Sequence, residues 1–394
     1  MQVAVHGEVA DGYGVVADEF RRNFTDRKEL GAAVAVVRDG KTVVDLWGGH
    51  RDKKRTKPWE RDTLTTVFST TKGMAATAMA VAHSRGLFDL EAPVAAYWPE
   101  FAQSGKEEVT VRQLLEHEAG LAALDIGQLD IETVADDDRL GRILAAQEPN
   151  WVPGSAWGYH AWTLGWYESQ ILRRVDPQGR TIGRFFADEV AQRLGIEFYI
   201  GLPNSVDLDR LAELVGGGIL MQALHAHQTP WPLLRRLTNP RSLTFKAFNS
   251  GPRGRKLSDL NQPKLLAVEL PSVNGTGTVR ALAKVYGDLA TGGSGLAISQ
   301  ATLQELERPK TPAVDQIFGL ESAFRFGFMK PFPILPFGSS PRAYGHTGAG
   351  GSFAFADPET GTGYAYAMNR AGYSLPTDPR EIALREAAAR CPLV

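Results

Sequence analysis

The spacing of hydrophobic positions near the N-terminus predicts a helix followed by a β-hairpin. Residues 14–24 place four apolar side chains on one side of a helix: Val15, Val16, Phe20 and Phe24. Two apolar runs, 33–37 and 42–47, then flank the pair Asp39-Gly40. Aspartate and glycine supply the positive-φ positions that a tight hairpin turn needs, so these runs are expected to pair.

The C-terminal end of the chain repeats this arrangement. Large and small side chains alternate along residues 352–356 and 362–368, on either side of a turn at 357–361, as in a hairpin with one packed face. A closing helix is predicted over residues 380–390. Two hairpins at opposite ends of the chain, each beside a helix, predict one antiparallel sheet built from both termini.

The middle of the chain predicts mainly helices. Residues 109–115 combine an apolar stripe with a threonine at the N-cap position, and residues 163–174 and 181–194 have helical periodicity. Residues 228–270 are rich in proline, glycine and basic residues and show no clear period. That segment forms either a cap over a site or an irregular surface excursion.

These patterns together predict an α+β fold, in which an antiparallel sheet flanked by helices carries an inserted, mostly helical lobe. We expect a discontinuous sheet domain over residues 1–95 and 271–394. The helical domain is expected over residues 96–270 and includes the irregular segment 228–270.

Composition narrows the classes of function. Of the 394 residues, 43% are hydrophobic and 22% are charged, and the formal net charge is -2. Nothing in this balance favours nucleic acid or a membrane surface as a partner. The single cysteine, Cys391, excludes an intramolecular disulfide. The N-terminus lacks a basic patch followed by an apolar run, and no stretch approaches about 18 apolar residues, so a cytoplasmic location is expected.

The most informative polar residues are Ser69 and Lys72, which precede a stretch of small apolar residues, 73–82, that predicts a buried helix. Residues three apart lie on one helix face about one turn apart, so the amine can reach the hydroxyl. The helix N-terminus and burial both disfavour a cationic lysine. A neutral lysine beside a serine is a competent base for acyl transfer. The alternative, an N-cap serine with a solvated lysine, fits the apolar surroundings poorly.

Two further segments contain groups that could take part in catalysis. Proline and glycine in residues 153–158 place Tyr159 on a loop just before a helix, where its phenol could move a proton between the serine and a leaving group. Residues 345–351 contain four glycines and precede a strand. Glycine lets a backbone approach a ligand closely, so a main-chain N–H there can point at a developing oxyanion.

Together these residues resemble the serine β-lactamase-like family, which includes class C β-lactamases, D-alanyl-D-alanine peptidases and the family VIII carboxylesterases. In that family a Ser-x-x-Lys, a Tyr-x-Asn and a Lys-Thr-Gly motif occur in this order. They stand here as Ser69-Thr70-Thr71-Lys72, Tyr159-His160-Ala161 and His346-Thr347-Gly348. Residues 109–121 and 345–352 also resemble family segments. The similarity covers most of the chain and is weakest over residues 205–270.

The resemblance implies a site in the cleft between a sheet and a helical lobe. It implies that Ser69 is the nucleophile, with Lys72 and Tyr159 as the acid–base pair. The backbone N–H groups of Ser69 and Ala349 would form the oxyanion hole. The residues expected to contact substrate are His346, Thr347, Gly348, Trp157 and His160. No cofactor and no metal ion are expected, and His117 is interpreted as structural because no second histidine stands at metal-site spacing.

Two departures from the family pattern bear on the substrate. Ala161 replaces an asparagine whose amide would bind the substrate's own amide, and His346 replaces a lysine that would attract a substrate carboxylate. Losing a charged hydrogen bond removes about 1.5–3 kcal/mol of recognition. Both changes therefore favour uncharged esters, and His346 in this slot resembles the esterase branch. Nearby, Trp162 and Trp166 are interpreted as helix core and Trp157 as a pocket residue.

The expected function is hydrolysis of small, mostly apolar carboxylic esters through an acyl-enzyme on Ser69, with a small-molecule ester as the partner. A β-lactamase or a D-alanyl-D-alanine peptidase is the nearest alternative, because the same motifs serve both. A non-hydrolytic member that binds a ligand in its cleft is a third possibility. The physiological ester and the oligomeric state do not follow from the sequence.

Overall fold

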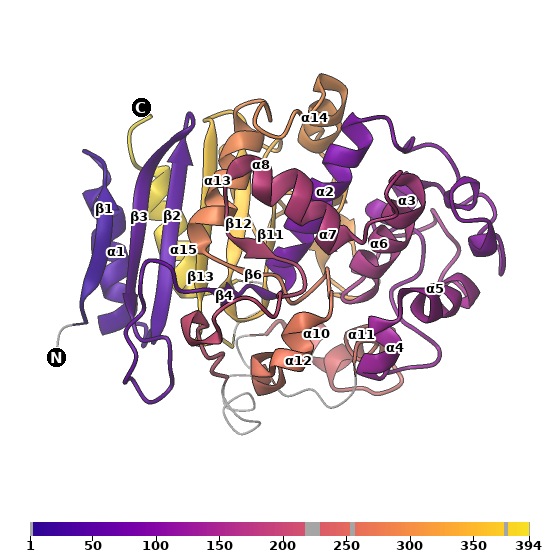
Figure 1. Ribbon diagram of the computed structural model, residues 1–394, viewed down its shortest axis with the longest axis horizontal. Coiled ribbons are helices and arrows are strands. Elements are labelled where there is room, and N and C mark those ends of the chain that lie inside the picture. The colour runs from indigo at the N-terminus through magenta and orange to yellow at the C-terminus, as the bar shows by residue number, and fades with distance from the viewer. Residues whose placement is uncertain (1–2, 217–228, 253–256, 374–376, 394) are drawn as a thin grey trace.

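The two ends of the chain build one antiparallel sheet (Figure 1). The computed structural model describes residues 3–216, 229–252, 257–373 and 377–393. Within these residues the main sheet contains eight strands. Their spatial order is β1 (Val5–Val9), β3 (Lys41–Gly49), β2 (Gly31–Arg38), β13 (Thr362–Met368), β12 (Phe353–Asp357), β11 (Tyr344–Thr347), β10 (Phe328–Met329) and β9 (Phe324–Arg325). The predicted α+β sheet from both termini is confirmed.

Both predicted hairpins are present. β2 and β3 pair antiparallel across Asp39 and Gly40, which take φ values of +47° and +75°. β12 and β13 pair in the same way, from Phe353 opposite Tyr366 to Asp357 opposite Thr362. β13 also pairs with β2, and this ladder joins the two ends of the chain. The alternating patterns therefore predicted the strands, and the β2–β13 pairing fixed their arrangement.

Helices cover both faces of the sheet. In Figure 1, α13 (Val279–Ala290) crosses the near face, and α1 (Gly14–Thr25) and α15 (Pro379–Ala389) pack together behind it. A Cβ on Gly363 of β13 would lie 2.1 Å from the backbone nitrogen of Gly287, so the helix can sit this close only on glycine. α1 buries Val16 and Phe20 as expected. Val15, which was expected on the same side, is 39% exposed instead.

The helical part of the molecule contains the elements that the periodicity predicted. Its helices are α2 (Thr71–Ser84), α3 (Val111–Leu115), α4 (Ile131–Ala135), α5 (Asp137–Ala146), α6 (Thr163–Val175), α7 (Ile182–Phe186), the π-helix η4 (Ala187–Ala191), α8 (Gln192–Leu194), α10 (Trp231–Leu237), α11 (Leu243–Phe248), α12 (Pro263–Ala267) and α14 (Gln300–Glu307). Thr110 caps α3 in a reciprocal capping box with Gln113. Every residue of α2 from Thr71 to Ala82 is buried, which confirms the predicted buried helix.

The remaining elements are short strands and 3-10 helices. A small sheet pairs β4 (Thr65–Thr66) and β5 (Phe198–Tyr199) with β6 (Thr276–Gly277), and a hairpin pairs β7 (Ala313–Val314) with β8 (Glu321–Ser322). The short 3-10 helices are η1 (Phe68–Thr70), η2 (Val94–Ala96), η3 (Pro99–Phe101), η5 (Leu208–Arg210), η7 (Leu257–Asn261) and η8 (Ala349–Gly351).

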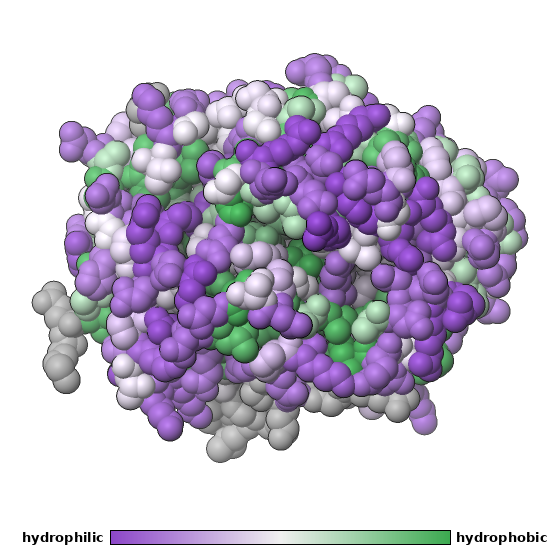
Figure 2. Space-filling view, viewed as in Figure 1, coloured by the Kyte–Doolittle hydropathy of each residue, from purple (hydrophilic) through white to green (hydrophobic). Residues whose placement is uncertain are grey.

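Hydrophilic residues cover most of the face in Figure 2, and hydrophobic residues show in separate patches. No helix among the described residues is long and apolar enough to span a bilayer.

Candidate active site

Ser69 lies on a strained turn at the start of the buried helix α2. Phe68, directly before it, takes a φ of +50°, a conformation that a bulky L-residue adopts only under constraint. Hydrogen bonds hold the turn in place. Ser352 donates from Oγ to the carbonyl of Val67 over 2.7 Å, so the hydroxyl of Thr70 donates to Ser352 Oγ over 3.0 Å. The start of β12 thus fixes the turn that carries Ser69, which is half-buried.

Lys72 reaches Ser69 from one turn further along α2. Its Nζ lies 3.5 Å from Ser69 Oγ, 2.7 Å from the carbonyl oxygen of Ala161 and 3.1 Å from that of Ser272. A neutral amine can donate its two hydrogens to these carbonyls and keep its lone pair for the serine hydroxyl. Burial lowers the pKa of Lys72 to about 7, against the opposing effect of the Glu168 carboxylate. The geometry therefore suits a lysine that acts as a base.

Tyr159 approaches the same hydroxyl from the loop before α6. Its phenol hydrogen-bonds to the Ser69 side chain, and Lys72 Nζ lies 4.8 Å from the centre of its ring. Phe318 and Phe324 stack on the ring, with centroid distances of 4.9 and 5.7 Å. Burial raises the pKa of Tyr159 well above its ordinary value, so the phenol keeps its proton at neutral pH. Lys72 and Tyr159, both expected from the sequence, thus approach the same oxygen, Oγ of Ser69.

Asp315 positions Tyr159, and the sequence analysis missed it. Its buried carboxylate accepts the backbone N–H of Tyr159 at 3.0 Å, the N–H of Ile317 at 2.7 Å and the hydroxyl of Ser322 at 2.9 Å. Burial raises the pKa of this carboxyl to about 6. Asp315 and Tyr159 are 156 positions apart in the chain, so no local pattern could have indicated the contact.

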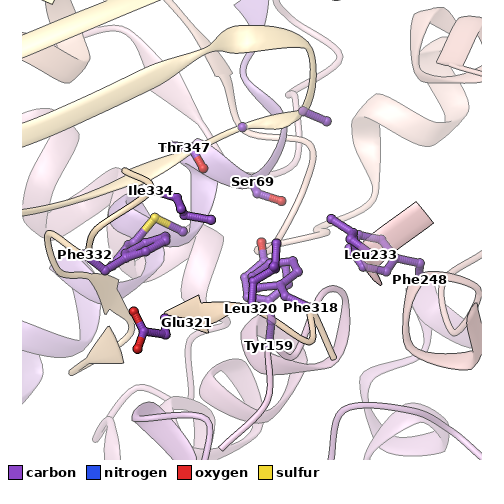
Figure 3. A pocket seen from close by; sticks show the side chains of 13 residues that line it. Ser69, Tyr159, Leu233, Phe248, Phe318, Leu320, Glu321, Phe332, Ile334 and Thr347 are labelled. Carbon is purple, nitrogen blue, oxygen red and sulfur yellow. The ribbon is translucent and has the colours of Figure 1, made fainter. Parts of the chain in front are cut away.

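The Ser69 hydroxyl opens onto an apolar pocket of about 690 Å³, its mouth included. The pocket is lined by Ser69, Tyr159, Leu233, Phe248, Phe318, Leu320, Glu321, Met329, Phe332, Ile334, Thr347, Gly348 and Ala349. Figure 3 shows Leu233 and Phe248 on one side of Ser69, and Phe332 and Ile334 on the other. Leu233 and Phe248 belong to α10 and α11, so part of the segment 228–270, which was expected to be irregular, is helical and supplies part of the wall. None of the leucine, isoleucine, methionine and phenylalanine side chains in this wall was expected from the sequence.

The structure brings some of the expected substrate residues to the pocket and places others behind it. Thr347, Gly348 and Ala349 line the wall, at the end of β11 and the start of η8. A Cβ on Gly348 would lie 2.2 Å from Ser352 Oγ and 2.4 Å from the Val67 carbonyl, so only glycine lets this strand end meet the turn before Ser69. The backbone of Ala349 is thereby brought to the same pocket as Ser69.

Trp157, His160 and His346 are not among the residues that line the described pocket. Trp157 donates from Nε1 to Ser322 Oγ at 3.2 Å and so supports the β7–β8 hairpin. His160 is fully buried and accepts the N–H of Leu121 on Nε2 at 3.0 Å. His346 is also fully buried, and its Nδ1 donates to the Thr347 carbonyl at 2.6 Å. Burial lowers the pKa of His346 to about 3, so the ring is neutral.

The chain is similar to known proteins over nearly its whole length. The chain matches the model of the Beta-lactamase family over residues 17–389. It is 35% identical to Esterase/beta-lactamase LipL of Mycobacterium tuberculosis, over 93% of this chain and 83% of that protein. The crystal structure of a family VIII carboxylesterase superposes with a TM-score of 0.85 and 38% identity, covering 99% of this chain and 100% of that one. A penicillin-binding protein homologue from Caulobacter crescentus gives a TM-score of 0.84 and 38% identity, covering 98% and 99%.

Proposed function

The chain belongs to the β-lactamase family, and from this premise we propose that it is a serine carboxylesterase acting on small, uncharged, mostly apolar esters. Ser69 is the nucleophile, and Lys72 and Tyr159 move its proton. Relatives named as esterases support hydrolysis of esters as the family activity most relevant to this chain. The cluster of Ser69, Lys72 and Tyr159 at one end of an apolar pocket supports the same assignment.

The proposed reaction has two halves. In the first, Lys72 Nζ takes the proton of Ser69, and Oγ forms a bond to the ester carbonyl carbon while the carbonyl electron pair moves onto oxygen. When this intermediate collapses, the bond to the alcohol oxygen breaks, and the alcohol leaves with the proton that Lys72 had accepted, passed on by Tyr159. In the second half, water attacks the acyl-enzyme with the same groups reversed, which releases the acid and restores the Ser69 hydroxyl.

The oxyanion would be bound by backbone N–H groups. Ser69 and Ala349 both border the pocket, and they come from the turn before α2 and from η8 after β11. Donors fixed in this way need no rearrangement as charge develops on the carbonyl oxygen. Removing one such donor typically lowers kcat by about 10²–10³, so this pair would carry much of the rate enhancement.

The observation that carries the substrate class is the charge of the pocket wall. Among the described residues that line it, Glu321 is the one charged side chain, and no lysine, arginine or histidine is present. Penicillins and the peptides that D-alanyl-D-alanine peptidases cleave bear a carboxylate, which needs a cation for recognition. A wall with a carboxylate and apolar side chains repels such substrates and favours uncharged ones.

A paired substrate test decides between ester and β-lactam hydrolysis. We expect kcat/KM for p-nitrophenyl butyrate to exceed that for nitrocefin by about 10² or more. Nitrocefin is an anion, and the described pocket wall offers its carboxylate no cation, so it lacks charged hydrogen bonds worth about 1.5–3 kcal/mol each. A fluorophosphonate probe should add its mass to Ser69 in the intact protein. Comparable turnover of the two substrates would favour the β-lactamase alternative, which the name of the Mycobacterium relative keeps open. An unlabelled Ser69 would favour a non-hydrolytic binding role.

The pH dependence of hydrolysis should follow the protonation of Lys72. Only the neutral amine can accept the serine proton, and the pKa of Lys72 is about 7. We therefore expect kcat/KM to rise with pH through about 7 and then to level off. The phenol of Tyr159 stays protonated over this range, because burial raises its pKa. Initial rates measured between about pH 5 and pH 9, on either side of this pKa, would check this. Activity that fell as the pH rose through 7 would contradict a lysine base.

A further inference from the structure

One carboxylate stands in the otherwise apolar pocket wall. Glu321 lines the pocket that opens from Ser69, and among the lining residues that the structure describes it is the one side chain with a charge. It is exposed to solvent, and its carboxylate has no hydrogen bond or ion pair with any described residue. The charge is therefore available to a molecule bound in the pocket.

The position of Glu321 is fixed by the β7–β8 hairpin, in which it lies opposite Val314. Successive side chains of a strand point to opposite faces. The next residue, Ser322, is accordingly buried and donates to Asp315 at 2.9 Å. Asp315 also accepts the backbone N–H of Tyr159 at 3.0 Å. One buried carboxylate thus holds both the hairpin and Tyr159, so Glu321 keeps a set position relative to the proposed catalytic residues.

Basic side chains on and around this hairpin have other partners. Arg236 of α10 donates to a backbone carbonyl in the turn of the hairpin, at 2.8 Å. Lys310, shortly before β7, pairs with Glu116 at 2.7 Å. Lys330, at the end of β10, is buried and donates to three backbone carbonyls at 2.9–3.3 Å. None of the three forms an ion pair with Glu321, so a cation for this carboxylate would have to come with the substrate.

Aromatic rings line the same pocket as Glu321. They belong to Tyr159, Phe248, Phe318 and Phe332. Figure 3 shows Phe332 and Glu321 to the same side of Ser69. The face of an aromatic ring attracts a cation, and the attraction grows when the cation leaves water. A wall that combines one carboxylate with several rings therefore suits an organic cation.

The polar groups of the wall favour an alkylated ammonium over a primary one. A primary ammonium has three N–H donors, which need acceptors once they leave water. Besides Glu321, the side-chain oxygens among the described lining residues are those of Ser69, Tyr159 and Thr347. The first two are engaged with each other in the proposed reaction. A quaternary ammonium has no N–H to satisfy and binds through its charge and its methyl groups.

We propose that Glu321 is a specificity-determining residue, which selects esters that end in a quaternary ammonium group over neutral esters of the same shape. The inference rests on the proposed function, because it concerns the substrate that acylates Ser69, and it extends that function from uncharged esters to cationic ones. Glu321 makes and breaks no bond. It binds the cation alike in the ground state and the transition state, so its effect should appear in KM and not in kcat.

Two pairs of esters test this selection. Butyrylcholine and its neutral isostere, in which a tert-butyl group replaces the trimethylammonium group, place the charge in the alcohol. The ethyl ester of γ-trimethylammonio-butyric acid and its tert-butyl isostere place it in the acyl part. For each pair the quantity measured is the charge ratio, kcat/KM of the cationic ester divided by that of the neutral one. We expect a charge ratio of about five in at least one pair, the scale of one partly exposed ion pair.

Changing the charge at position 321 should change this ratio. In E321Q it should fall about fivefold, through a higher KM for the cationic ester. In E321K it should fall further, because the introduced charge repels the ammonium group. The neutral ester of each pair measures any general loss of activity in these variants. Added salt should lower the wild-type ratio as well, since charges at an exposed site are screened.

Glu108→Gln is the matched control. Glu108 is also exposed, but it lies on the loop before α3 and is not among the residues that line this pocket. E108Q changes the net charge of the protein by the same amount as E321Q. We expect it to leave the charge ratio at the wild-type value, which separates a local effect of Glu321 from that of net charge.

The deciding experiment is the charge ratio of both ester pairs for the wild type, E321Q, E321K and E108Q. A wild-type ratio above one in at least one pair, lowered in E321Q and E321K and kept in E108Q, supports the proposal. Wild-type ratios of one or less in both pairs overturn it, and so does a ratio that the two Glu321 variants leave unchanged or that E108Q lowers equally. Failure of the proposed function looks different: the wild type would hydrolyse none of the four esters, and the fluorophosphonate would leave Ser69 unlabelled.

Discussion

Replacing Ser69 with alanine is expected to lower kcat/KM for p-nitrophenyl butyrate by a factor of about 10⁴ or more, the scale seen when a catalytic nucleophile is removed. The remaining groups can still bind the ester, but no oxygen is left to form the acyl-enzyme. The contacts of the Ser69 hydroxyl are with Lys72 and Tyr159, and none of them holds the turn together. The variant should therefore unfold at nearly the same urea concentration as the wild type. Steady-state kinetics and urea titration measure the two effects.

Ser155→Ala is the control for this experiment. Ser155 is exposed on the loop ahead of Tyr159, and its hydroxyl donates only to the nearby carbonyl of Val152, at 2.6 Å. We expect this variant to keep the wild-type rate. If Ser69→Ala kept substantial activity that Ser155→Ala also kept, another residue would be the nucleophile and the proposed mechanism would be wrong.

The largest expected effect on stability comes from replacing Arg380 with methionine. Arg380 is 4% exposed and lies at the start of α15. Its guanidinium donates to Glu29 at 2.9 Å, to Asp378 at 2.8 Å and to the carbonyls of Arg370 and Gly350 at 2.9 and 3.0 Å. Removing it leaves the fully buried carboxylate of Glu29 without its cation. Breaking a buried pair in this way lowers the free energy of unfolding by about 3–5 kcal/mol.

The same change should reduce activity, because Gly350 follows the proposed oxyanion residue Ala349. Urea unfolding and ester kinetics of the same preparation measure both effects. Arg342→Met provides the comparison: Arg342 is 47% exposed and pairs with Glu307 and Glu359 at the surface, where a pair is worth about 0–1 kcal/mol. Equal losses in the two variants would show that the buried network is not what holds α15 to the sheet.

Patterns of neighbouring residues were sufficient to predict the elements that depend on short-range interactions. The alternation of side chains and the Asp39-Gly40 turn predicted the β2–β3 hairpin, because strand period and positive-φ turns depend on neighbouring residues. Helix geometry likewise placed Lys72 one turn from Ser69, and the structure has the two side chains 3.5 Å apart. The one error in this part, Val15, arose because periodicity gives a helix face but not which edge of that face a neighbouring element covers.

Contacts between residues that are far apart in the chain could not be predicted from the sequence. Asp315 and the wall residues Leu233 and Phe248 lie far along the chain from Tyr159, and ordinary aspartate, leucine and phenylalanine carry no signal of what they will contact. The choice of Tyr159 among the tyrosines came from the family resemblance. Glu168 was hidden for another reason: a helical glutamate is normally exposed, and only packing against α2 and Gly327 buries it.

The sequence by itself thus determined the strands, the main helices and the serine–lysine pair, since each depends on residues within a few positions of one another. The tertiary structure alone decided the apolar pocket wall, which has no cation among the residues that the structure describes, together with the support of Tyr159 by Asp315 and the burial of Glu168. Those features depend on distance and dielectric environment in three dimensions, and both are set only when the helical part closes against the sheet.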